Sequence, residues 1–320
     1  MDKLQKMDAI EPVDGPTDWV SPVVVVPKGE EHEDEIRMVL DMRKPNTAIR
    51  RNHKPVPTLD EMLEKFNGCT VFSKLDLRHG YHQIELHPDS RHITTFSTHI
   101  GLFRYKRLVQ GANSALEEYQ HLIGNLFIGV DHVGNISDDL LVGGVDQEEH
   151  DNNLEKALCI LKENNLTLNK NKCEFDKKNV EFFGFNISGE GIRPTQSKVA
   201  AIKAFPAPTN ATECRSFLGL INYLGRFIPN LSSETELLRK LTEKGVKWDW
   251  TVNHDKVFAN LKALVSSRAV VAHFNQSLET YLIVDAGPVG LGGILAQKQI
   301  DNSIRPVAYA SKTLTKTEQR

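Results

Sequence analysis

Two adjacent aspartates, Asp138 and Asp139, stand between apolar residues, and this pair limits the possible folds more than any other feature of the sequence. Neighbouring carboxylates repel each other and have low strand propensity, so we expect the pair at the tip of a hairpin between two strands. A third aspartate, Asp76, ends another apolar run. Carboxylates from these two places, brought together, would make the hard-oxygen site that Mg²⁺ prefers. The alternative for the pair alone is a solvated turn.

Short sequence blocks occur in a fixed order on both sides of these aspartates. They are Trp19-Val20-Ser21-Pro22, Ile36-Arg37-Met38-Val39-Leu40-Asp41, Thr94-Thr95-Phe96, Leu166-Thr167-Leu168-Asn169, Phe183-Gly184-Phe185 and Arg215-Ser216-Phe217-Leu218-Gly219. Together the blocks resemble the reverse transcriptases of gypsy-type LTR retrotransposons, from about Trp19 to the last residue. The resemblance implies a fragment of a Pol polyprotein that acts as an RNA-directed DNA polymerase.

The resemblance also implies an α+β fold. It consists of a right-hand polymerase with fingers, a ferredoxin-like palm with an antiparallel sheet and a thumb or connection, plus an incomplete RNase H-like α/β domain. We expect a flexible lead-in over residues 1–18, fingers and palm over 19–186, a thumb or connection over 187–250 and the partial RNase H-like domain over 251–320. Apolar residues at helical spacing predict helices from Asp60, near Ser114–Phe127, after a cap at Asp146, from Glu213 to Phe227, from Glu234 to Leu241 and over Val257–Leu264.

Composition limits the class of protein. With 320 residues, of which 40% are hydrophobic, the chain can form two or three domains with a real core. No apolar run approaches the ~18 residues of a membrane helix, and the first residues lack the apolar segment of a signal peptide. The 4 cysteines have no Cys-x-x-Cys spacing, which favours reduced thiols. We therefore expect no membrane partner and no secretion, but an intracellular protein that is cytoplasmic, including inside virus-like particles, or nuclear.

The net charge of −3 is not the basic balance typical of nucleic-acid-binding proteins. Lysine and arginine are nevertheless concentrated between residues 37 and 54 and again between 104 and 107, while acids gather elsewhere. A locally positive channel on a mildly acidic body still attracts phosphate. The alternative for each cluster is an ordinary charged surface.

The resemblance assigns the catalytic chemistry to Asp76, Asp138 and Asp139. DNA synthesis is an in-line attack of the primer 3′-hydroxyl on a dNTP, and charge must be neutralised on the attacking and leaving oxygens. Two Mg²⁺ ions about 3.5–4 Å apart supply that neutralisation, and Mn²⁺ could replace them. The implied partners are a dNTP and an RNA or DNA template-primer, while the oligomeric state stays open.

Other residues match nucleotide-binding positions of the family. Lys28 and Arg37 lie in a predicted hairpin that is expected to close over the triphosphate, where an ammonium and a guanidinium suit phosphate charge. Tyr81 matches the aromatic residue beneath the incoming sugar, which excludes a ribose 2′-hydroxyl. Gln110 stands where the family commonly has Phe, in Leu108-Val109-Gln110-Gly111, and is expected to bond the nucleotide or template.

The remaining matches concern the primer and the last domain. Phe183 and Gly184 match a primer-gripping hairpin. Asp285 matches the first metal ligand of an RNase H, but the chain stops soon after the capping box of Thr315 and Glu318, before further acids. We therefore expect this chain to lack RNase H activity.

One departure leaves an alternative function open. Ile136 stands where the family has a tyrosine, two residues before Asp138. The alternative, which Ile136 and the incomplete RNase H-like domain favour, is a catalytically silent retroelement relic that only binds nucleic acid. The three intact aspartates favour the polymerase.

Overall fold

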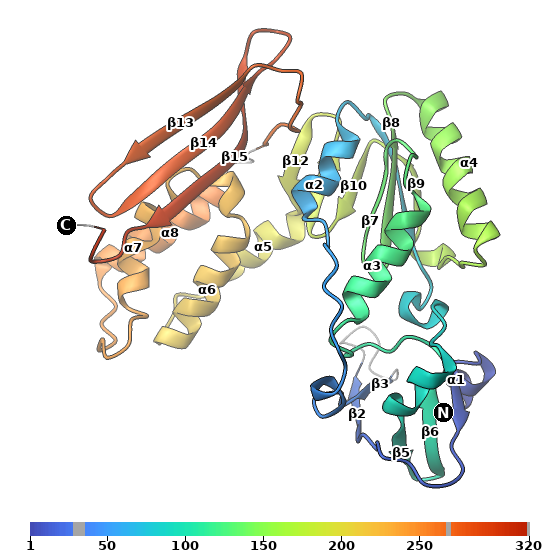
Figure 1. Cartoon of the computed structure of the whole chain (residues 1–320). Coiled ribbons are helices and arrows are strands. Elements are labelled where there is room, and N and C mark those ends of the chain that lie inside the picture. Colours follow the sequence, from blue (N-terminus) through green and yellow to red (C-terminus); the bar gives the residue numbers. More distant parts are fainter. Residues whose placement is uncertain (28–35, 267–269, 319–320) are drawn as a thin grey trace. The chain divides into compact units, whose positions relative to one another are not determined.

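The computed structural model describes residues 1–27, 36–266 and 270–318 (Figure 1). Lys28 lies outside the described residues, and so does the side chain of Arg37. The chain divides into two compact units. The first contains residues 1–65 and 73–175, and the second contains residues 66–72 and 176–320.

A four-stranded sheet carries the three aspartates. Its strand order is β7 (Val133–Ile136), β8 (Asp139–Gly144), β4 (Val71–Asp76) and β9 (Glu174–Lys177). Helices α3 (Ala115–Leu126) and α4 (Gln147–Glu163) lie against it (Figure 1). The buried core between them includes Leu75, Tyr119, Ile123, Leu140, Ala157 and Leu161. The cap predicted for α4 is present, because the Asp146 side chain accepts from the Glu149 N–H at 2.9 Å.

Smaller elements complete the first unit. Strands β2 (Val23–Pro27) and β3 (Ile36–Leu40) form an antiparallel pair, and the short helix α2 (Leu59–Leu63) begins with a capping box between Thr58 and Glu61. Strands β5 (Phe96–Thr98) and β6 (Gly101–Tyr105) form a second antiparallel pair.

The expectation of a flexible lead-in over residues 1–18 is wrong. This segment contains helix α1 (Asp2–Lys6) and strand β1 (Ile10–Pro12), and β1 pairs with β6. Ala9 and Ile10 are 0% and 4% exposed, and Ile10 packs with Phe96 and Phe103. The physical reason is long-range pairing, which stabilises a strand too short to show periodicity.

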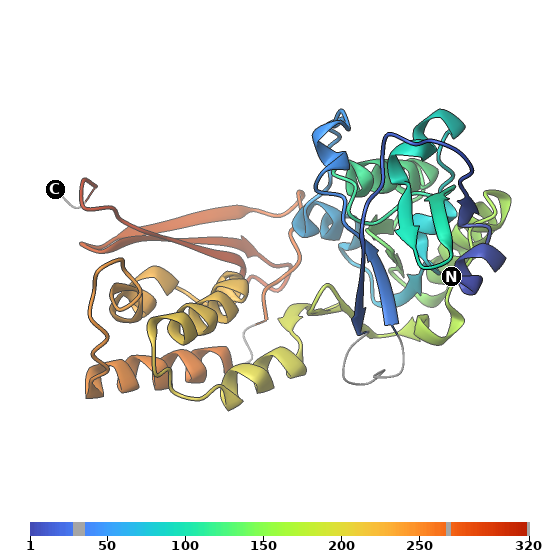
Figure 2. The same cartoon turned by 90° about the horizontal axis from the view of Figure 1, so that it is seen from below.

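The second unit begins with a three-stranded antiparallel sheet of β10 (Asn179–Phe182), β11 (Phe185–Ser188) and β12 (Gly191–Pro194). The α-helices that follow in the described residues are α5 (Gln196–Ala204), α6 (Ala211–Tyr223), α7 (Leu231–Lys240) and α8 (Val252–Ser266). A long antiparallel sheet of β13 (Thr280–Ala286), β14 (Gly290–Lys298) and β15 (Ile304–Thr313) runs beside these helices (Figure 2).

The units do not follow the domain boundaries expected from the sequence. The predicted palm includes residues 176–186, whereas these residues, with β10 and the start of β11, belong to the second unit. The reason is that Ile192 exchanges backbone hydrogen bonds of 2.9 and 3.2 Å with Val271, and Phe185 stacks on Tyr223. Helix α7 packs on α8 and on β15, so the second unit continues through residue 250 without a break. In the described part of the chain, no helix has the length and apolar character that a membrane crossing needs.

Candidate active site

The hairpin between β7 and β8 presents Asp138 and Asp139. Ile136 pairs with Asp139, so Ser137 and Asp138 form a two-residue turn. Ser137 has a φ of 53°, in the left-handed region that such tight turns require at their first position. The acid-bearing hairpin expected from the sequence is therefore present.

Asp76 is the last residue of β4, which lies next to β8 in the sheet. Along β4, Ser73 and Leu75 are fully buried, whereas Lys74 and Asp76 are partly exposed. Asp76 therefore lies on the face opposite that of Ser73 and Leu75, because successive side chains of a strand point to opposite faces. The Leu77 N–H donates to the Asp138 carbonyl at 2.9 Å. This bond joins the end of β4 to the turn between β7 and β8.

The charge of Asp76 acts on the neighbouring carboxylate of Asp139. Burial raises the pKa of Asp139, and the negative charge of Asp76 raises it further, while the nearby ammonium of Lys74 lowers it. Lys74 Nζ lies 3.7 Å from Asp139 Oδ2, and Lys172 Nζ lies 3.6 Å from Asp76 Oδ2. Partly buried carboxylates that repel one another in this way are stabilised by a cation.

The donor set fits a divalent ion such as Mg²⁺, because it consists of carboxylate oxygens. Gly80 begins the 3₁₀ helix Gly80–Gln83. Because glycine has no side chain, the backbone there can lie close to the Asp138 carboxylate. A Cβ at Gly80 would lie 2.5 Å from Asp138 Oδ1 and would also collide with the Tyr119 hydroxyl. Burial raises the pKa of Tyr119, and the charge of Asp138 adds to this effect, so the hydroxyl stays protonated beside the carboxylate.

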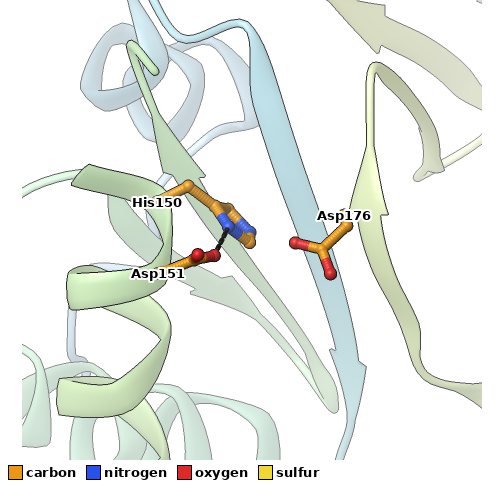
Figure 3. A group of neighbouring side chains, drawn as sticks. All are labelled: His150, Asp151 and Asp176. Carbon is orange, nitrogen blue, oxygen red and sulfur yellow. Dashed lines mark hydrogen bonds and ion pairs between the residues drawn. The ribbon is translucent and has the colours of Figure 1, made fainter. Parts of the chain in front are cut away.

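The aspartates do not form the tightest cluster of metal-ligating groups. Among the described residues, only His150, Asp151 and Asp176 bring three such ligand atoms within 4.8 Å of one another (Figure 3). His150 is fully buried, and its ring nitrogens lie 2.9 Å from Ser73 Oγ and 3.0 Å from Asp151 Oδ1. Both nitrogens are thus engaged within the first unit, whereas Asp176 opens the second unit. We assign no role to the three side chains together.

Tyr81, the residue predicted to lie beneath the sugar, is close enough to Asp138 for the two groups to interact electrostatically. Its ring stacks on the Tyr119 ring, with centroids 4.8 Å apart and an interplanar angle of 24°. Burial raises the pKa of Tyr81, and the charge of Asp138 contributes to the same shift. The structure therefore brings Tyr81 and Asp138 into one neighbourhood. Tyr119, Gly80 and this stacking were not identified from the sequence, although a glycine between two bulky residues was a usable signal.

Gln110 is exposed and precedes Gly111, whose φ is 100°. Asn46 holds this loop: its Nδ2 donates to the Gly111 carbonyl at 2.9 Å, and its Oδ1 accepts from the Asn113 N–H at 2.9 Å. A cavity of about 400 Å³ adjoins Gly111 and is lined by Val24, Val26, Val39, Leu40, Asp41, Met42, Arg43 and Asn46. The backbone of Arg37 pairs with Val26 in the neighbouring strand pair. No local pattern in the sequence indicated that Asn46 positions the Gln110 loop.

In the second unit, Phe183 and Gly184 form the turn between β10 and β11, with φ values of 49° and 73°. Tyr223 holds this turn, because its hydroxyl donates to the Phe183 carbonyl and its ring stacks on Phe185 at 5.1 Å. A Cβ at Gly184 would lie 2.7 Å from the Tyr223 hydroxyl, so the turn needs glycine there. Phe183 is 40% exposed at the tip, which leaves its ring accessible.

Asp285 is an exposed residue of β13 and faces Gly292 of β14. Leu282 and Val284 on the same strand are 72% and 71% exposed. Over the described ranges, Asp285 belongs to no group of three metal-ligating side chains.

Two family models match different parts of the chain. A family model described as reverse transcriptase (RNA-dependent DNA polymerase) matches residues 26–187, and one described as an RNase H-like domain found in reverse transcriptase matches residues 250–320. The Tf2-3 transposon polyprotein of Schizosaccharomyces pombe is 35% identical over 300 residues, which cover 93% of this chain and 22% of the polyprotein. The Tf2-7 polyprotein of the same yeast is 34% identical over 299 residues, with the same coverage. The chain therefore spans about a fifth of the length of these curated relatives.

Solved structures share the fold. A foamy viral protease-reverse transcriptase in complex with double-stranded DNA matches with a TM-score of 0.89 and 24% identity, covering 100% of this chain and 55% of that chain. A complex of the foamy viral enzyme with an RNA/DNA hybrid matches with a TM-score of 0.87 and 24% identity, covering 100% of this chain and 42% of that chain. This is the right-hand polymerase fold expected from the sequence. With a family model matching half of its residues and the acid-bearing hairpin in place, the chain belongs to the reverse transcriptase (RNA-dependent DNA polymerase) family.

Proposed function

We propose that this chain is the polymerase part of a gypsy-type retrotransposon Pol polyprotein and extends a primer on an RNA or DNA template. The observation that carries the proposal is the link between the end of β4, with Asp76, and the turn that presents Asp138 and Asp139. The Tf2 polyproteins support a retrotransposon origin. The proposed location is inside the cell.

Enzymes of this family use divalent metal ions. In the proposal, Asp76, Asp138 and Asp139 hold two Mg²⁺ ions, or Mn²⁺. When bound, such ions neutralise charge on the attacking 3′-oxygen and on the leaving pyrophosphate. The chain's own ammonium groups, on Lys74 and Lys172, limit the repulsion among the carboxylates before ions bind.

The other candidate residues orient the substrates. Tyr81 forms a wall for the sugar of the dNTP, supported from behind by Tyr119. Gln110, on the loop held by Asn46, contacts the nucleotide or template. Phe183 and Gly184 contact the primer strand. Lys28 and Arg37 bind the triphosphate, on the basis of their sequence positions alone.

Template-primer binding is supported by the foamy viral structures, which are complexes with double-stranded DNA or an RNA/DNA hybrid. Acidic side chains partly neutralise the basic stretch between residues 37 and 54 in the structure. Arg51 pairs with Glu117 at 3.0 Å, and Lys54 pairs with Glu118 at 2.6 Å. Fewer cations than the sequence suggests are therefore available for phosphate.

The relic is not favoured as an alternative function. Ile136, the departure that suggested it, is 8% exposed and keeps its backbone pairing with Asp139. An apolar side chain at this position is therefore accommodated in the core without disturbing the acid-bearing turn. The absence of RNase H activity stays a prediction.

Primer extension on a homopolymer RNA template with Mg²⁺ tests the proposed function. We expect the wild-type chain to extend the primer, Asp138→Asn to fail, and both to bind template-primer with similar affinity, because binding depends mainly on phosphate contacts. A wild-type chain that binds but does not extend would support the relic. Equal extension by wild type and Asp138→Asn would remove the assigned site.

A further inference from the structure

We propose that Gln120 is a positioning residue that holds the turn between β7 and β8 in the geometry needed for metal binding; this rests on the proposed polymerase function. Gln120 lies on α3 and is 3% exposed. Its Nε2 donates to the Asn135 carbonyl at 2.8 Å, and its Oε1 accepts from the Ser137 N–H at 2.9 Å. One side-chain amide thus bonds the backbone on both sides of Ile136, next to the turn.

The backbone groups that Gln120 bonds would otherwise lack strand partners. Strand β7 is an edge strand, because the sheet order is β7-β8-β4-β9. In an antiparallel pair, alternate residues direct their N–H and C=O groups toward the partner strand, and the others direct them outward. Asn135 and Ser137 alternate with Ile136, which pairs with β8, so their groups point outward. The Gln120 amide supplies one donor and one acceptor, as a neighbouring strand would.

A second backbone group on the outer edge of β7 also forms a hydrogen bond with a side chain. Lys65 Nζ donates to the carbonyl of Val133 at 3.4 Å. Val133 and Asn135 lie two residues apart on the outer edge of β7, and Ser137 follows at the same spacing in the turn. Since Val133 is fully buried and Asn135 is 5% exposed, water is a poor substitute for these bonds.

The bond to Ser137 is the one that bears on the metal site. Ser137 adopts the left-handed conformation at the start of the turn, and Asp138 is the next residue. The Asp138 carbonyl is fixed from the other side by the Leu77 N–H at 2.9 Å. Gln120 and Leu77 therefore hold consecutive residues of the turn from two directions. Without the amide, only one of these two constraints on the position of the Asp138 carboxylate remains.

If Gln120 only stabilised the fold, replacing it would lower stability without a specific loss of metal binding. Asn153, another buried amide, is the matched control for this distinction. Asn153 is 4% exposed on α4, and its Nδ2 donates to the Gly143 carbonyl at 3.1 Å. This is also a buried amide bonded to the backbone of the hairpin, but Gly143 lies near the end of β8 that is remote from the turn. Replacing Asn153 should lower stability without changing the affinity for metal.

The test measures Mn²⁺ binding to the full chain by electron paramagnetic resonance, with Asp138→Asn defining the signal from this site. We expect Gln120→Met to weaken Mn²⁺ binding about tenfold, the scale found when groups that orient metal ligands are removed. Gln120→Asn, which keeps an amide but is one methylene too short to reach both groups, should show the same loss. Asn153→Leu should melt at a lower temperature and bind Mn²⁺ like wild type.

The outcomes separate this inference from the proposed function. Wild-type Mn²⁺ affinity in a folded Gln120→Met or Gln120→Asn chain would overturn the positioning role, even if primer extension is intact in the wild type. Equal weakening by Asn153→Leu would also overturn it, because the effect would then be general loosening. Failure of the wild-type chain to extend primers would instead overturn the proposed function, while the Mn²⁺ affinities would still decide the role of Gln120.

Discussion

Asp76 and Asp285 both follow apolar runs on strands, yet their surroundings differ. In the strand of Asp76, Phe72 and Leu75 are 0% exposed. In the strand of Asp285, Leu282 and Val284 are 72% and 71% exposed. The strand of Asp76 lies between two other strands, β8 and β9, whereas β13 is an edge strand of its sheet.

The neighbouring strands explain why only one of these acids is in a candidate active site. Next to Asp76, β8 begins with Asp139 and follows a turn that contains Asp138. Opposite Asp285, β14 contributes Gly292, which has no side chain to bind metal. In the proposed site, Asp76 is a candidate metal ligand because the next strand and its turn bring two further acids to the same end of the sheet. An aspartate that follows apolar residues occurs in both places, so this local sequence pattern does not distinguish Asp76 from Asp285.

The largest expected effect comes from the acids themselves. We expect Asp76→Asn, Asp138→Asn and Asp139→Asn each to reduce primer extension by more than about a hundredfold, the scale on which lost charge stabilisation acts in active sites. Asp285→Asn should extend primers like wild type. Single-turnover extension rates provide the measurement. A normal rate for Asp76→Asn, or a large loss for Asp285→Asn, would contradict the assignment of Asp76 rather than Asp285 to the polymerase active site.

The second largest expected effect on primer extension comes from disturbing the close packing around Asp138. Gly80→Ala should lower the extension rate about tenfold to a hundredfold, because its Cβ would displace Asp138 or Tyr119 and small misplacements of reacting groups are costly. Gly219→Ala on α6 is the control, since its Cβ would meet no atom within 4 Å. Equal rates for Gly80→Ala and wild type would mean that the approach of Gly80 to Asp138 is not needed.

Tyr81→Ala should reduce the preference for dNTP over rNTP by about tenfold or more, a common scale for discrimination by a pocket wall. The reason is that alanine leaves room for a 2′-hydroxyl. Tyr81→Phe keeps the ring and its stacking on Tyr119, so it should discriminate like wild type. The ratio of incorporation efficiencies is the measurement, and an unchanged ratio in Tyr81→Ala would exclude Tyr81 as the wall.

A smaller effect concerns pH. Because the Lys74 charge opposes the rise in the pKa of Asp139, Lys74→Gln should raise that pKa further. Metal binding needs the ionised carboxylate, so the acid limb of the pH profile for primer extension should move to higher pH. Lys312→Gln, in the second unit, should leave the profile unchanged. An acid limb that moves to lower pH in Lys74→Gln would contradict the assigned charge balance.

The raised pKa of Asp139 also predicts the direction in which the stability of the folded chain changes with pH. In the metal-free chain, the contribution of protonated Asp139 is present below the ordinary pKa of 3.8 and is lost as pH rises through the raised pKa of the folded state. Asp139→Asn should therefore remove this part of the pH dependence. Urea unfolding at several pH values measures it, and an unchanged dependence in Asp139→Asn would show that the raised pKa is not coupled to folding.

Local patterns predicted much of the first unit. The apolar flanks of Asp138 and Asp139 indicated the hairpin, and Asp146 with Glu149 indicated the start of α4. These features depend on residues close together in the chain. The order of sequence blocks then indicated the fold and the roles proposed for the three aspartates.

The missed features depend on contacts between distant segments. Strand β1 forms only because β6 offers a partner, and no periodicity within three residues announces it. Gln120 reads as an ordinary helix residue, since its partners are 15 and 17 residues further along the chain. The sheet β10–β12 joined the second unit through Val271 and Tyr223, whose contacts no local pattern could reveal.

Anomalous scattering from Mn²⁺ in crystals of the chain with template-primer and a matching dNTP tests the central claim most directly. We expect two peaks about 3.5–4 Å apart between Asp76, Asp138 and Asp139, and none beside Asp285. Peaks beside Asp285 or His150, with none at the three aspartates, would contradict the assignment of the active site.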